Sequence, residues 1–108
     1  MRANKNHLII IKSEKPPTIE LDASYGSVYI RFKNSKIVNT LERCVTGPII
    51  SVDIDRLGEV VGVESLFCDQ FQIGQILKKA QVEAPRIDLA RATFRRPSRV
   101  SEEAGAFA

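Results

Sequence analysis

The sequence predicts an α+β domain, in which an antiparallel β-meander of four to five strands is followed by one amphipathic helix and a disordered C-terminal tail. Apolar and polar residues alternate with a period of two through the first two thirds of the chain, and helical spacing appears only after Cys68. The connections between the predicted strands are too short to hold crossover helices, so consecutive strands should be antiparallel neighbours. Strands followed by a helix therefore place the chain in the α+β class.

The first predicted strands lie in the first third of the chain. Residues 7–12 are rich in β-branched side chains and indicate a strand or an ordered N-terminal arm. Residues 18–22 form a short strand, because Ile19 and Leu21 alternate with polar residues. The clearest strand is 27–33, where the apolar residues share one face and the polar residues share the other. This pattern predicts a sheet with one core face and one solvated face.

A first hairpin is predicted directly after that strand. Asn34 and Ser35 suit a two-residue turn, because Asn tolerates a positive φ. Residues 36–43 are then the returning strand, which ends at the turn-forming cluster 46–48.

A second hairpin joins strands at 49–54 and 59–66. Asp55 supplies a side-chain acceptor and Gly58 supplies the conformational freedom that a tight connection needs, so both are structural turn residues. Gly62 lies inside the second strand, where a glycine indicates a bulge or a close approach of another element, here the helix.

One amphipathic helix is predicted after Cys68. Asp69 is its expected N-cap, Lys78 and Lys79 lie near its C-terminal end, and Pro85 is expected to stop it. The apolar stripe comprises Phe71 or Ile73, together with Ile76, Leu77 and Ala80.

A shorter helical turn is expected next, capped by Asp88 and running to Phe94. Residues 1–94 would form the single domain, and residues 95–108, rich in arginine, serine and small residues, would be a flexible tail.

Composition excludes several classes of protein. The chain has 108 residues, of which 44% are hydrophobic and 27% charged, as expected for one small soluble domain. No apolar run approaches the roughly 20 residues that span a bilayer, and no signal sequence is evident, so we expect a cytoplasmic protein without membrane contact. Cys44 and Cys68 have no metal-binding or redox spacing and are expected to remain thiols.

Side chains for catalysis or cofactor binding are sparse. His7 is the only histidine, and neither cysteine lies in a nucleophile motif, so the sequence favours a protein that is not an enzyme. Asp53 and Asp55 lack the later ligands of a calcium loop, and Glu64 lacks an evident catalytic partner. The glycines form no phosphate-binding loop, so no cofactor is expected.

Positive charge is concentrated in the C-terminal third. The net charge is +3, and residues 69–100 hold seven basic side chains against three acidic ones. Such residues are candidates for binding phosphates or an acidic protein, although a solvated tail has the same composition. The possible interaction residues are Arg86, Arg91, Arg95, Arg96 and Arg99.

Three segments resemble a known family. Residues 49–66, IISVDIDRLGEVVGVESL, resemble the hallmark hairpin of a bacterial family catalogued as domain of unknown function 2283, and residues 21–23 and 28–32 resemble its first strand and the entry loop of that strand. The likeness covers residues 19–66, but the family's usual acidic turn residue is replaced here by Tyr25-Gly26-Ser27. It implies a small β-meander followed by a helix, without established activity, that acts as a partner of small neighbouring proteins, including antitoxin-like partners.

These observations predict a binding module that is not an enzyme, with a protein partner or a second copy bound at a sheet edge or by the C-terminal segment. The alternative is a nucleic-acid-associated accessory protein that uses the arginine-rich end. A small hydrolase using Glu64 or Cys68 is a third class, which would need a pocket with a base nearby.

Overall fold

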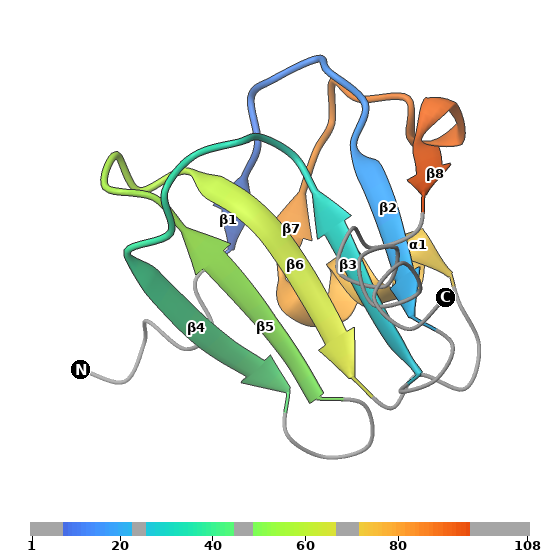
Figure 1. Ribbon diagram of the computed structural model, residues 1–108. Helices are drawn as coiled ribbons and strands as arrows, with labels where there is room; N and C mark the ends of the chain where they lie inside the picture. The colour runs from blue at the N-terminus through green and yellow to red at the C-terminus, as the bar shows by residue number, and fades with distance from the viewer. Residues whose placement is uncertain (1–7, 23–25, 45–48, 67–71, 96–108) are drawn as a thin grey trace, which may run out of the picture.

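The computed structural model describes residues 8–22, 26–44, 49–66 and 72–95. In this part of the chain a six-stranded sheet, in the order β4-β5-β6-β3-β2-β8, lies in front of one helix and a two-stranded sheet of β1 and β7 (Figure 1). The larger sheet consists of β2 (Thr18–Asp22), β3 (Ser27–Arg31), β4 (Asn39–Cys44), β5 (Ile49–Ile54), β6 (Val60–Leu66) and β8 (Thr93–Arg95). The other elements are β1 (Ile9–Ile10), α1 (Ile73–Ala80), β7 (Val82–Glu83) and a 3₁₀ helix, η2 (Leu89–Arg91).

The prediction of a meander is wrong between β3 and β4. Asn34 and Ser35 do not form a hairpin turn; residues 32–38 instead pass the ends of β6 and β5 and place β4 at the far edge of the sheet (Figure 1). The backbone N–H of Phe32 donates to the carbonyl of Val61 at 2.8 Å, which keeps the end of β3 against β6. The four strands β3 to β6 therefore have a Greek-key order.

The sequence of β6 explains this pairing. Residues 60–63 are buried at every position. A meander would leave β6 at an edge of the sheet, whereas here β3 and β5 pair with it on both sides. The run does not alternate because the register of β6 shifts between Val60 and Gly62, and because the Tyr29 ring covers Gly62 on the polar face. The turn potential of Asn34 and Ser35 is a weaker constraint than the burial that β6 requires.

Two parallel pairings raise the strand count above the four to five expected. β1 pairs with β7, with Ile9 opposite Val82, and β8 pairs with β2. Asp88 caps η2 by accepting a hydrogen bond from the Ala90 N–H at 3.1 Å, but Phe94 belongs to β8 and not to the predicted helical turn. The two strands of a parallel pair are distant in sequence, so no turn motif between them indicates the pairing.

The helix is shorter than predicted. Its described part begins at Ile73, and the expected N-cap, Asp69, lies outside the described residues. It ends at Ala80, before Pro85, because Gln81 adopts a left-handed conformation with φ of 60° and the chain turns into β7. The predicted stripe does reach the core: the buried helix residues are Ile76, Leu77 and Ala80.

The large sheet has an apolar face and a polar face. Its apolar face packs against α1, and the residues there with 0% exposure include Ile19, Ile30, Val52 and Val63. The opposite face carries the polar residues of the same strands, as the alternation predicts. In the predicted tail, only Arg95 lies within the described residues, as the last residue of β8. No helix of the described chain has the length and apolar character that crossing a membrane requires.

Candidate functional site

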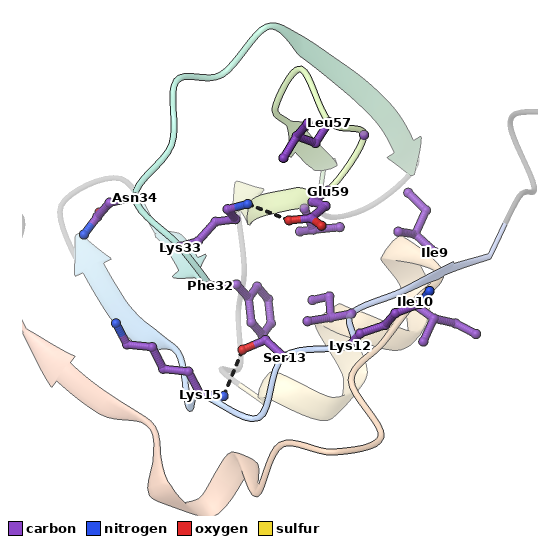
Figure 2. Close-up of a pocket in the computed structure, with 13 residues that line it drawn as sticks. Ile9, Ile10, Lys12, Ser13, Lys15, Phe32, Lys33, Asn34, Leu57 and Glu59 are labelled. Atoms are coloured by element: carbon purple, nitrogen blue, oxygen red, sulfur yellow. Dashed lines mark hydrogen bonds and ion pairs between the residues drawn. The ribbon is translucent and has the colours of Figure 1, made fainter.

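A groove of about 800 Å³ opens between the N-terminal segment and one end of the large sheet (Figure 2). One wall is β1 with the loop after it, and the other comes from the end of β3 and from the β5–β6 turn. Ligand-binding pockets commonly have volumes of roughly 300–1,000 Å³. The groove is therefore large enough for a short peptide segment or a small molecule.

The β5–β6 turn forms part of this groove through local chemistry. Asp55 Oδ1 accepts hydrogen bonds from the backbone N–H groups of Leu57 at 2.9 Å and Glu59 at 3.0 Å. Gly58 has φ of +82°, a conformation that other residues adopt only with strain. Asp55 and Gly58 therefore fix the conformation of the turn. In this conformation Leu57 is exposed to solvent over 75% of its surface.

Lys33 joins the end of β3 to this turn. Its Nζ lies 2.8 Å from Asp55 Oδ2 and 2.6 Å from Glu59 Oε1. The Lys33 ammonium, together with the N–H groups of Glu59 and Leu57, lowers the pKa of Asp55 to about 2. The same two carboxylates raise the pKa of Lys33. The positive charge of Lys33 is therefore already neutralised within the groove wall.

This ion pair makes a pH-dependent prediction. Asp55 has a pKa of about 2 in the folded protein and an ordinary value of 3.8, so its ionised form stabilises the fold above about pH 4, and this contribution disappears as the pH falls towards 2. Asp55→Asn removes the ion pair. Urea unfolding should show the variant less stable than wild type near neutral pH, with the two curves converging near about pH 2. An equal difference at both pH values would contradict the assigned role.

The other wall has a free strand edge. The N–H groups of Ile9 and Ile11 donate to the carbonyls of Gln81 and Glu83, at 2.9 and 2.7 Å. In a parallel pair, alternate residues direct their backbone groups towards the partner strand, so the N–H and C=O of Ile10 point away from β7. Within the described chain β1 has β7 as its one strand partner. The backbone of β1 can therefore pair with an additional strand.

The groove lining combines apolar and basic side chains. Ile10 and Leu57 are exposed over 51% and 75% of their surfaces. Lys12 and Lys15 line the β1 side, and Figure 2 shows them along the wall opposite Lys33. Neither of these two lysines makes an ion pair with another described residue. Exposed aliphatic groups next to unpaired cations are a typical composition for an interaction site.

The β4 edge of the large sheet is less suited to strand addition. On β4, the Oδ1 of Asn39 accepts the backbone N–H of Thr40 at 2.9 Å, so a local side chain occupies this donor. The register of β4 shifts between Glu42 and Cys44. A bulge of this kind protects a strand edge against pairing with other chains.

A hydrogen-bonded network covers the polar face of the large sheet. The Tyr29 hydroxyl donates to Asp53 Oδ2 at 2.8 Å, and the Thr40 hydroxyl donates to Asp53 Oδ1 at 2.7 Å. The Arg31 guanidinium lies 4.9 Å from the centroid of the Tyr29 ring. To reach Asp53, the ring crosses directly over Gly62. The close approach predicted at Gly62 is thus to Tyr29 on the polar face, and not to the helix.

Two acidic groups of this face have raised pKa values. Burial raises the pKa of Tyr29, and its hydrogen bond to the Asp53 carboxylate raises it further. Burial, with a smaller contribution from Asp53, also raises the pKa of Glu64. Because Tyr29 and Asp53 bind each other, we assign this network to the stability of the sheet. In the described residues, no group of three or more His, Cys, Asp or Glu side chains is arranged to hold a metal ion.

Of the arginines singled out from the sequence, the described Arg86 and Arg91 do not line the groove. Arg86 pairs with Glu14 at 3.0 Å, and both side chains are exposed. Arg91 is exposed on η2, and Arg95 ends β8. Arg96 and Arg99 lie outside the described residues. Within the described chain, Arg86, Arg91 and Arg95 therefore belong to different segments, and Arg86 has an acidic partner.

Sequence reasoning missed the groove, although one signal for it was present. Leu57 is a large aliphatic residue inside a turn, where packing does not require one. The lysines at positions 12, 15 and 33 gave no signal, because they belong to segments that meet only in the folded chain.

Comparison of the chain with family models, with curated proteins and with solved structures finds no match. The resemblance of residues 19–66 to domain of unknown function 2283 stays a prediction.

Proposed function

We propose that this protein is a binding module without catalytic activity, and that it accepts an extended segment of a partner protein in the groove beside β1. The observation that carries the proposal is the free edge of β1, which forms one wall of the groove. Main-chain hydrogen bonds to such an edge supply affinity, and pockets for alternate side chains supply specificity.

The location of the edge strengthens the proposal. The groove provides a volume of about 800 Å³ beside this edge, and exposed Ile10 and Leu57 offer apolar contacts on both walls. By contrast, the β4 edge has a bulge and a locally satisfied donor. Strand addition at β1 therefore has more support than dimerisation through the large sheet. Nucleic-acid binding through the arginines has less support, because Arg86 is already paired with Glu14.

Selection from a random peptide library displayed on phage tests the proposal without knowledge of the partner. Wild-type protein should enrich peptides, and Ile10→Pro should weaken their binding by about tenfold, because proline removes the N–H of Ile10, which points away from β7. The β1–β7 bonds use the N–H groups of Ile9 and Ile11, so this variant leaves them intact.

Ile10→Ala is the matched control, since it shortens the side chain but keeps the N–H. Its loss of affinity should be smaller than that of Ile10→Pro. Circular dichroism of both variants checks that they fold. The proposal fails if no peptide is enriched, or if the selected peptides bind Ile10→Pro as well as wild type.

A further inference from the structure

The two walls of the groove differ in charge and polarity, and this difference specifies the partner. Resting on the proposed function, we infer that the groove selects an extended peptide in which acidic and aliphatic residues alternate, with the acidic side chains on Lys12 and Lys15. Three features support this inference: the geometry of β1, the apolar floor of the groove and the ion pairs of the lysines that line it.

The alternation of β1 sets the two faces of a guest strand. Ile11 points into the core and is 8% exposed, whereas Ile10 is 51% exposed and shares its side of the strand with Lys12. A strand paired with β1 alternates in the same way. Every second side chain of the guest therefore faces the protein, and the others face the side of Ile10 and Lys12.

The floor of the groove is apolar. Phe32 and Val60 line it, although only 5% and 4% of their surfaces are exposed, and Figure 2 shows Phe32 between the two walls. A polar guest side chain placed against this floor would lose its hydration without gaining a hydrogen bond. Aliphatic residues are consequently preferred at the positions of the guest that face the protein.

The charges on the walls are not equivalent. Lys33 is neutralised by Asp55 and Glu59 at 2.8 and 2.6 Å. Lys12 and Lys15 make no ion pair with any described side chain. The acid between them in sequence, Glu14, pairs instead with Arg86 at 3.0 Å. Within the described chain, the segment that follows β1 thus presents two cations without an acidic partner, which favour carboxylates on the guest and repel basic residues.

The length of the guest follows from the strand repeat. A peptide of roughly six residues spans roughly 20 Å when extended, and it offers three side chains to each face. Peptides of this length with alternating Glu and Val, Gln and Val, or Lys and Val differ only in the charge of one face. They are the probes for the experiment.

Fluorescence anisotropy of the three labelled peptides tests the inference. Wild type should bind the Glu-Val peptide roughly three- to tenfold tighter than the Gln-Val peptide, as expected for two exposed ionic contacts, and the Lys-Val peptide most weakly. Added salt should narrow this difference. Reversing both charges with Lys12→Glu and Lys15→Glu should invert the order of the peptides.

The control reverses two exposed cations outside the groove lining, Lys79→Glu with Arg91→Glu. It changes the net charge by the same amount and should leave the order of the peptides unchanged. If it inverts the order as well, long-range charge accounts for the preference and the inference is wrong.

Other results separate the inference from the proposed function. Equal binding of the three peptides, each weakened by Ile10→Pro, would overturn the charge preference but leave strand addition intact. No binding of any peptide would overturn the inference, and an unsuccessful library selection would overturn the proposed function separately. Tighter binding of a single-stranded oligonucleotide than of the Glu-Val peptide, lost in the Lys12→Glu, Lys15→Glu variant, would assign the cations to nucleic acid instead.

Discussion

Val52→Asp should abolish the cooperative unfolding transition of this protein. Val52 has 0% exposure in β5, opposite Leu41 of β4 and Val63 of β6. A carboxylate at this position would lose its hydration among aliphatic side chains. The expected cost is more than about 4 kcal/mol, a large part of the roughly 5–15 kcal/mol that stabilises a typical domain. Thermal melting followed by circular dichroism should show no folded baseline.

Leu57→Asp is the matched control, because it also replaces an aliphatic residue by aspartate. Leu57 is 75% exposed in the β5–β6 turn, so its replacement should change the free energy of unfolding by only about 0.5 kcal/mol. Similar melting temperatures for the two variants would show that β5 does not bury Val52.

Gly62→Ala should destabilise the protein by roughly 1–3 kcal/mol, although alanine is usually the better residue inside a strand. A Cβ on Gly62 would overlap the hydroxyl end of the Tyr29 ring. The ring would have to swing away and lose its hydrogen bond of 2.8 Å to Asp53. Urea unfolding followed by circular dichroism gives the change in free energy.

A double-mutant cycle with Tyr29→Ala identifies the cause. Without the ring, the new methyl group has space, and Gly62→Ala should then stabilise the fold by roughly 0.5–1 kcal/mol through the lower entropy of the unfolded chain. The sign of the effect therefore depends on Tyr29. The same destabilisation in both backgrounds would mean that backbone conformation, and not the tyrosine, requires a glycine.

Alternation predicted the strands well where one face is buried and the other is solvated. The predicted ranges 18–22 and 49–54 are the bounds of β2 and β5 in the structure. β5 keeps the predicted alternation throughout, whereas in β2 it fails at the last two positions, where Leu21 is 38% exposed and Asp22 only 7%. β8 gave no such signal, because a three-residue strand is too short for its alternation to be distinguished from a helical turn.

Only the local part of the candidate site could be predicted. The acceptor Asp55 and the positive φ of Gly58 act within one turn, and both residues stand out in the sequence. The position of Lys33 beside that turn depends on the pairing of β3 with β6. The arginines stood out because they are close in sequence, but the described Arg86 and Arg91 do not belong to the lining of the groove.

The sequence by itself determined local properties: where most strands of the large sheet lie, which face of the central strands is apolar, where the β5–β6 turn lies and which helix residues meet the core. These follow from periodicity and turn chemistry, which act between residues close in the chain. Only the tertiary structure decided that β4 crosses to the far edge, that β1 pairs with β7 and that a groove opens between the β1 segment and the end of the large sheet. Such pairings depend on the burial of the whole sheet, and many partners satisfy the same local pattern equally well.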